Sequence, residues 1–161
     1  MGALRIVLAD LDDAAHAAAV VDLVDAYARE PLARGAPLPD DVRLRLVPGL
    51  RAHAGAVVFL AFEGGASLGI AVCFTGFSTF AARPLLNVHD LAVRADHRGR
   101  GVGRALLAAV EDHARARGFC KLTLEVQEHN TPARALYAAV GFEGYALDPA
   151  GGGALLLQKS L

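Results

Sequence analysis

The stretch that decides the fold is DHRGRGVGRALLAAVEDHARARG, residues 96–118. Its second half has the pattern of an amphipathic helix, because apolar residues recur on one face at Val102, Leu106 and Val110. The pattern predicts a helix over residues 102–117. Its first half is rich in glycine and arginine, which are unusual choices for the beginning of a helix.

The beginning of this predicted helix carries residues that suit an anion. The first turn of a helix exposes unpaired N–H groups and a partial positive charge. Glycine lets a ligand approach the backbone without meeting a Cβ atom, and arginine adds positive charge. Together they predict a site for a phosphate or pyrophosphate, formed by Gly99, Gly101, Gly103, Arg98, Arg100 and Arg104.

The composition is that of one folded domain, residues 1–161, with 54% hydrophobic and 20% charged residues. The net charge of −1 creates no overall field that favours nucleic acid or an anionic membrane, so we expect neither as a partner. No apolar run approaches the roughly 20 residues of a membrane helix. The first residues lack the features of a signal peptide, so we expect a cytoplasmic protein.

Cysteine and histidine give no sign of a disulfide or a metal site. Cys73 and Cys120 each lie in an apolar, strand-like stretch, where a buried thiol is the usual outcome. The six histidines show no spacing typical of metal ligands. We therefore expect no metal.

The order of the predicted elements indicates an α+β fold. Helices are expected at 12–30, at 40–53 with an interruption at Pro48, at 102–117, and from Thr131 as N-cap to Gly141. The expected strands are 3–9, 56–63, 67–77, 84–93, 120–126, 142–147 and 154–161. We expect a mixed, mostly antiparallel, twisted sheet flanked by helices, with one β-α-β crossover through the helix at 102–117.

Three kinds of ligand site use a glycine-rich turn before a helix. A P-loop is excluded, because Gly103 is followed by Arg104 and Ala105 instead of lysine and a hydroxyl residue. A dinucleotide site needs G-x-G-x-x-G in the first β-α turn, whereas this turn follows four predicted strands. Glu125 at a suitable distance keeps a dinucleotide-binding protein as a weak alternative. The third kind is an acyl-CoA site.

Four segments resemble the GNAT superfamily of N-acetyltransferases. RGRGVG at 98–103 is similar to the family's R/Q-x-x-G-x-G/A pyrophosphate motif. HDLAV at 89–93 resembles the preceding strand, LEVQEHN at 124–130 the following one, and NTPARALYAAVGF at 130–142 the N-x-x-A-x-x-L-Y-x-x-x-G-F segment. The stretch 74–93 also resembles diamine and thialysine acetyltransferases. The resemblance implies the GNAT fold.

The resemblance also implies where acetyl-CoA lies. The strands 84–93 and 120–126 would splay apart, and the pantetheine amides would pair with the backbone at Leu91 and Val93 like an added strand. The pyrophosphate would take the N–H groups of residues 98–104. The residues implied in binding acetyl-CoA are Leu91, Ala92, Val93, Arg98, Gly99, Arg100, Gly101, Val102, Gly103, Arg104, Asn130 and Tyr137.

The implied catalytic residues serve proton transfer. Tyr137 is implied as the general acid that gives a proton to the departing thiolate. An amine acceptor with a pKa near that of lysine, about 10.4, must lose a proton before it attacks. The candidates for this base are His89, Asp90 and Glu125. Strand alternation predicts that the first two point to opposite faces. In polyamine-acetylating relatives a glutamate stands where this chain has His89.

We therefore expect an enzyme that moves an acetyl group from acetyl-CoA to a primary amine, such as a polyamine or lysine-like molecule, by direct attack in a ternary complex. The alternative is a non-catalytic acyl-CoA-binding module. Residues 25–55 and 74–88 would set the acceptor. The apolar C-terminal end and the final strands predict a homodimer.

Overall fold

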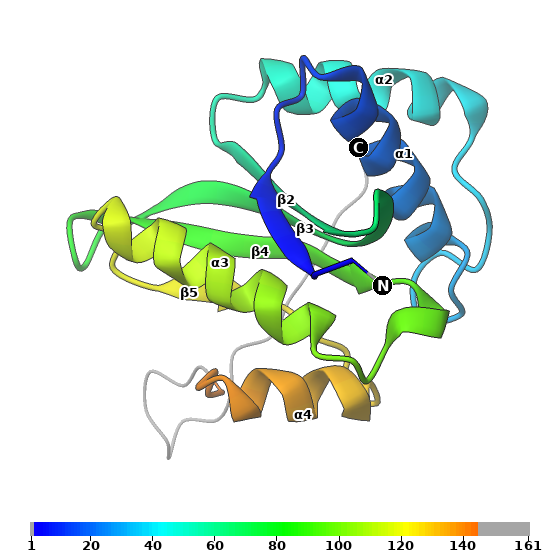
Figure 1. Cartoon of the computed structure of the whole chain (residues 1–161). Helices are drawn as coiled ribbons and strands as arrows, with labels where there is room; N and C mark the ends of the chain where they lie inside the picture. Colours follow the sequence, from blue (N-terminus) through cyan, green and yellow to red (C-terminus); the bar gives the residue numbers. More distant parts are fainter. Residues whose placement is uncertain (1, 145–161) are drawn as a thin grey trace. The chain divides into compact units, whose positions relative to one another are not determined.

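The computed structural model describes residues 2–144 (Figure 1). It contains a five-stranded sheet in the order β1-β2-β3-β4-β5. All neighbouring strands are antiparallel except β4 and β5, which are parallel. The predicted α+β class and mixed sheet are confirmed. The strands are β1 (Arg5–Leu8), β2 (Ala56–Glu63), β3 (Ala66–Ser78), β4 (Arg83–Val93) and β5 (Leu122–Leu124).

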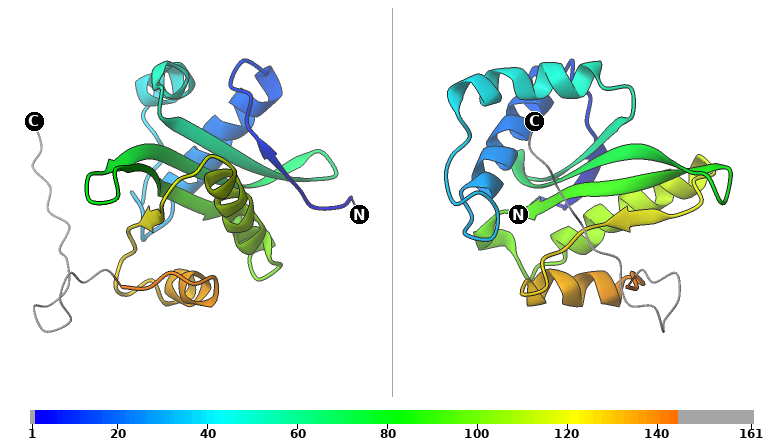
Figure 2. Two further views of the ribbon diagram at one scale, coloured as in Figure 1. Left: turned by 90° about the vertical axis from the view of Figure 1, so that its left-hand side faces the viewer. Right: turned by 180° about the vertical axis from the view of Figure 1, so that it is seen from behind.

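Helices cover both faces of the sheet (Figure 2). One face packs against α1 (Ala14–Ala28) and α2 (Asp40–Ala52), and its buried core includes Leu60, Ile70 and Val72. The other face packs against α3 (Val102–Ala116), where a Cβ at Gly69 would touch side chains of that helix. The two faces therefore have separate apolar layers, with the sheet between them.

The helix α1 begins at a side-chain cap. The carboxylate of Asp13 accepts a hydrogen bond of 2.9 Å from the N–H of His16, which satisfies one of the free donors of the first turn. Val20, Leu23 and Ala28 are buried along the face that packs on the sheet. The helix predicted at 12–30 thus begins at Ala14, with Asp13 as its cap.

The helix α2 differs from its prediction, because it continues through Pro48 to Ala52. A proline lacks the N–H that would bond the carbonyl four residues earlier, here that of Leu44. Leu44 is 77% exposed, so water can donate the missing hydrogen bond to its carbonyl. Val47 and Leu50 on either side of the proline are buried and hold both turns on the core. Tertiary packing therefore overrides the helix-breaking tendency.

The crossover helix α3 agrees with its prediction. Its N-cap is Gly101, in the left-handed region with φ 83°, and Gly118 beyond its end has φ 71°. Val102, Leu106 and Val110 are buried on the face toward the sheet. These glycines allow the sharp entry and exit of the chain that a side chain would oppose.

The chain divides into two compact units, residues up to 127 and residues from 128. The second contains α4 (Thr131–Ala139). The predicted N-cap Thr131 is wrong: Asn130 caps the helix, and its side-chain oxygen accepts from the N–H of Ala133 at 3.3 Å. Residues 142–144 form no strand, and the rest of the last two predicted strands lies outside the described residues.

None of the helices within residues 2–144 is long and apolar enough to cross a membrane.

Candidate functional site

The strands β4 and β5 separate halfway along β4. Their parallel pairing ends at Val88 and Leu124. One residue earlier, the side chain of Asn87 on β4 donates to Thr123 Oγ1 on β5 at 3.0 Å and links the two strands. From His89 to Val93, β4 continues without a partner on this side among the described residues. The predicted strand 120–126 is therefore shorter, and an open strand edge follows the point of separation.

The register of β3 and β4 decides which backbone groups face this open edge. Arg94 donates its N–H to the carbonyl of Leu68 at 2.8 Å, so this position is a hydrogen-bonded pair. Such pairs alternate along an antiparallel ladder with pairs whose N–H and C=O groups point away. Leu91 and Val93, opposite Ala71 and Gly69, thus point their backbone groups toward the open edge. Ala92 faces β3 with its backbone groups.

The chain then forms the turn that leads into α3. The first backbone bond of this helix runs from the N–H of Ala105 to the carbonyl of Gly101 at 2.9 Å. Within residues 2–144, the six consecutive N–H groups of residues 99–104 have no hydrogen-bond acceptor. A Cβ atom at Gly99 or Gly101 would meet nothing within 4 Å. Free donors at an accessible helix start form an anion-binding site.

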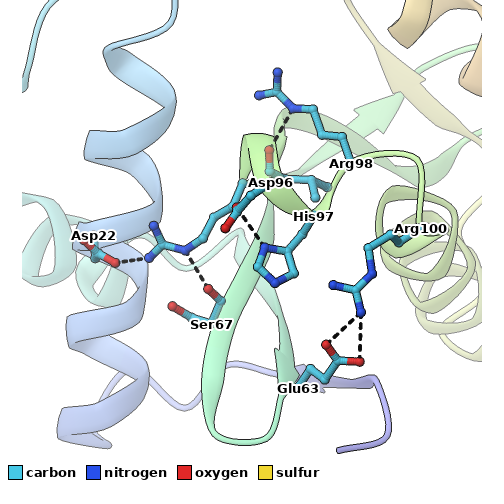
Figure 3. Close-up of polar contacts among 9 residues, drawn as sticks. Asp22, Glu63, Ser67, Asp96, His97, Arg98 and Arg100 are labelled. Carbon is cyan, nitrogen blue, oxygen red and sulfur yellow. Dashed lines mark hydrogen bonds and ion pairs between the residues drawn. The ribbon is translucent and has the colours of Figure 1, made fainter. Parts of the chain in front are cut away.

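Two of the three arginines in this turn are engaged with carboxylates, and Figure 3 shows the pair of Arg100 with Glu63. Arg98 donates its Nε–H to the carbonyl of Val93 at 3.0 Å and pairs with Glu30, which follows the C-cap of α1. Arg100 pairs with Glu63 of β2 at 3.0 Å. Arg104 is exposed and has no ion pair within the described part of the chain. Among residues 2–144, no carboxylate is paired with the charge of Arg104.

A bulge in β4 changes the predicted directions of two candidate bases. Asp90 lies opposite Val72 and Val88 opposite Cys73, so His89 is an extra residue without a counterpart. The prediction that His89 and Asp90 point to opposite faces is therefore wrong.

Both side chains lie on the face that α1 and α2 cover. The ring of His89 lies 5.4 Å from that of Phe74, which packs on the core of this face. Asp90 is paired with Val72, a member of the same core. The two candidate bases can therefore act on one substrate group.

The electrostatic environment singles out Asp90. Burial raises the pKa of its carboxyl, and the charge of neighbouring His89 partly opposes the rise. Burial also raises the pKa of Tyr27 on α1, and so does the charge of Asp90. The thiol of Cys73 has its pKa raised to about 12 by burial and, further, by Asp90. The carboxylate of Asp90 has no hydrogen-bond or ion-pair partner within residues 2–144. It is a half-buried carboxylate with increased basicity.

The predicted site residues that remain are Glu125, Asn130 and Tyr137. Glu125 is exposed and directly follows the last paired residue of β5. Asn130 and Tyr137 belong to the second unit. There Asn130 caps α4, and the ring of Tyr137 lies 5.8 Å from that of Phe142.

Sequence reasoning missed the residues that anchor the loop between α1 and α2. Buried Asp25 accepts from the N–H of Leu38 at 2.8 Å and pairs with Arg29 and Arg43, and the Leu38 bond is the main reason that its pKa is lowered. Gln127 donates to the carbonyl of Leu32 at 2.9 Å. The predicted helix 12–30 contains several acidic residues, and no motif or spacing distinguishes Asp25 from the others, so its burial follows only from the packing of the folded chain.

Metal-binding groups do not appear in the described ranges: no three His, Cys, Asp or Glu side chains gather there. Cys73 and Cys120 are both free thiols.

Two curated proteins are similar to part of the chain. The uncharacterized N-acetyltransferase YhfO of Bacillus subtilis (strain 168) is 34% identical over 88 residues, 55% of this chain and 59% of that protein. The streptothricin acetyltransferase of Streptomyces lavendulae is 40% identical over 77 residues, 48% of this chain and 41% of that protein. The chain thus spans about half the length of these two relatives.

Whole-chain similarity is found among solved structures. The crystal structure of a probable acetyltransferase superposes with a TM-score of 0.79 at 22% identity, and the match covers 97% of this chain and 99% of that one. The model of the acetyltransferase (GNAT) family matches residues 20–142. That range holds the separating strands, the bulge and the open helix start. With its fold, its site geometry and this match in agreement, the chain belongs to the acetyltransferase (GNAT) family.

Proposed function

We propose that this protein transfers an acetyl group from acetyl-CoA to the amine of a small molecule, by direct attack in a ternary complex. The observation that carries the proposal is the row of unbonded N–H groups at residues 99–104, next to the open edge of β4. These are the two features needed to bind a pyrophosphate and an extended, amide-containing arm. Residues 1–161 act in this proposal as one acetyltransferase domain.

On the donor side, the pyrophosphate binds the N–H groups of residues 99–104, with Arg104 adding charge. The pantetheine arm pairs with the backbone of Leu91 and Val93. Arg98 already donates to the Val93 carbonyl, so the guanidinium shares or leaves that acceptor when the arm binds. When bound, acetyl-CoA supplies a thioester carbonyl carbon that an amine can attack.

On the acceptor side, Asp90 or His89 takes the proton that the ammonium group must lose, directly or through water. The bond from the amine nitrogen to the acetyl carbon forms, and the bond from that carbon to sulfur breaks. Tyr137 supplies a proton to the departing thiolate in this proposal. Glu125 is the remaining candidate base.

The streptothricin acetyltransferase supports a small-molecule acceptor, because its name states such a substrate. The alternative is a module that binds acyl-CoA without turnover. A half-buried carboxylate with a raised pKa at the strand separation favours the enzyme, since such a group has no use in binding an anionic donor.

The test is thiol release from acetyl-CoA with a panel of amines that includes polyamines, lysine analogues, aminoglycosides and peptide N-termini. We expect amine-dependent release for at least one class, and its loss in Asp90→Asn. Binding of acetyl-CoA without thiol release for any amine would favour the non-catalytic module. The expected homodimer and the cytoplasmic location stay predictions, since the C-terminal segment that motivates the dimer lies outside the described residues.

A further inference from the structure

Three rings form a row beside Asp90 that the proposed acetyl transfer does not use. The ring of Phe74 on β3 lies between two histidines, 5.4 Å from His89 on β4 and 5.0 Å from His53 at the end of α2. Both contacts are edge-to-face, which is a favourable aromatic geometry. Both histidines are exposed and Phe74 is half-buried, so the row can be reached by a ligand.

The backbone around it holds this row in place. His53 accepts at Nδ1 from the N–H of Gly55 at 3.2 Å, and the carbonyl of Gly55 accepts from the N–H of Thr75 at 2.8 Å. A Cβ at Gly55 would come within 3.3 Å of the Thr75 carbonyl and 3.4 Å of the His53 ring. Close packing against β3 therefore positions His53 next to Phe74 before any ligand arrives, which lowers the cost of binding.

On the face that α1 and α2 cover, the free negative charge next to the three rings matches a ligand with one positive charge. The elements that build it are β1 to β4, α1, α2 and the segments that join them, and they contribute ten carboxylates. Six of the ten are paired with arginines: Asp12, Asp22, Asp25, Glu30, Asp41 and Glu63.

The other four carboxylates are Asp10, Asp13, Asp40 and Asp90. Asp10 and Asp13 accept hydrogen bonds from backbone N–H groups at the start of α1. Asp40 is the first residue of α2, about 20 Å of helix away from His53 at the other end. Asp90 thus remains as the carboxylate beside the rings. Polycationic amines require several free carboxylates, which this face does not offer in the described residues.

We propose that the acceptor is an arylalkyl amine: a single primary amine joined by a short chain to a flat ring. This proposal rests on the proposed acetyl transfer and names the substrate class of the same site. The ammonium group lies at Asp90 and His89, and the ring packs against Phe74 and His53. Phe74 and His53 are then the residues that determine specificity. The amine nitrogen gains the acetyl group and loses its proton to the base, while the carbon–sulfur bond of the donor breaks.

The test compares kcat/KM for 2-phenylethylamine, n-butylamine, spermidine and an aminoglycoside. Adding a ring to a site that fits it raises kcat/KM by roughly ten- to hundredfold, so we expect 2-phenylethylamine to exceed n-butylamine by that factor and spermidine to be poorer still. Phe74→Leu should reduce the preference to about threefold or less, through KM for the amine, with the affinity for CoA unchanged.

The matched control is Phe62→Leu. Phe62 also packs on this core next to a histidine ring, His16 at 5.8 Å, but it lies at the far end of β2. We expect this variant to keep the full preference for the aromatic amine. An equal loss in both variants would show general loosening of the core and would overturn the assignment of Phe74.

The two proposals fail in different ways. Turnover of n-butylamine or spermidine at or above the rate of 2-phenylethylamine overturns the arylalkyl class and leaves acetyl transfer in place. If no amine is acetylated, acetyl transfer fails, and calorimetric titration of 2-phenylethylamine into the protein with CoA decides the second question. Binding that Phe74→Leu weakens supports the ring site, and absence of binding overturns it.

Discussion

Asp90 lies where a general base would be useful, and its surroundings make it a stronger base than an exposed aspartate. Burial raises the pKa of its carboxyl, and no arginine among the described residues offsets its charge. The base must be deprotonated to act, so the activity should fall toward acid pH at a higher pH than an aspartate with the ordinary pKa of 3.8 would give.

Asp90→Asn keeps the shape of the side chain and removes the charge. General base catalysis contributes about 10²–10⁴-fold, and we expect a loss of kcat/KM in that range with unchanged affinity for CoA. Steady-state kinetics and a CoA titration on the same sample test this. Retained turnover in Asp90→Asn together with loss in His89→Gln would move the role of base to His89.

Gly103 offers the cleaner test of the donor site among the three glycines. Gly101 has φ 83°, so a valine there is strained in the backbone whether or not a ligand binds. Gly103 lies inside the first turn of α3. We expect Gly103→Val to weaken CoA binding by at least about tenfold, or ~1.4 kcal/mol, because the side chain blocks approach to the N–H groups.

The control for that substitution is Ala108→Val, at an exposed position of the same helix. It introduces the same β-branched residue away from the helix start. Equal CoA affinity in a folded Gly103→Val protein and in this control would contradict the site.

Tyr137→Phe removes one hydroxyl and keeps the ring next to Phe142. As the proposed general acid, the hydroxyl should contribute toward the low end of about 10²–10⁴-fold in turnover, since a thiolate leaves readily. CoA affinity and melting temperature should change little. A drop in stability of ~1–3 kcal/mol with normal turnover of the folded protein would assign the hydroxyl a structural role instead.

At the scale of the elements, the spacing of apolar residues along the sequence predicted most helices and strands. It failed where contacts between distant segments interrupt the regular backbone, as at the bulge in β4. The apolar spacing of α3 reappears as its buried face, and the predicted strands 56–63 and 67–77 appear as β2 and β3, whose central residues are buried on both faces. Alternation could not predict the bulge at His89, because a bulge is visible only when two strands are set in register. The turn before α3 was predictable because its glycines are local in the sequence, whereas Phe74 is brought next to His53 and His89 only by the pairing of distant segments.

The helix α3 makes the stability of the protein sensitive to pH through His113. Its ring packs 5.5 Å from that of Phe59, and burial and then Arg117 lower its pKa from 6.5. The unfolded chain therefore binds this proton at higher pH than the folded one. Stability from this group is present above the unfolded pKa and is lost as the pH falls through the folded pKa.

We expect the unfolding free energy of the protein to fall between pH 7.5 and pH 5.5, and to fall less in His113→Gln. Denaturant titrations at both pH values measure this. The carboxylates with lowered pKa, such as Asp25, lose their stabilising effect only at more acid pH and do not interfere. An identical pH dependence in the two proteins would show that burial does not perturb His113.

At the scale of the whole molecule, the proposed function needs the separation of β4 from β5 and the open start of α3 to act as one site for acetyl-CoA. The most direct measurement follows the backbone N–H signals of labelled protein by NMR during titration with CoA, and with pantetheine, which lacks the pyrophosphate. We expect CoA to shift the signals of residues 99–104, Leu91 and Val93, and pantetheine to shift only those of Leu91 and Val93. Binding of CoA that leaves residues 99–104 unchanged would contradict the proposed site.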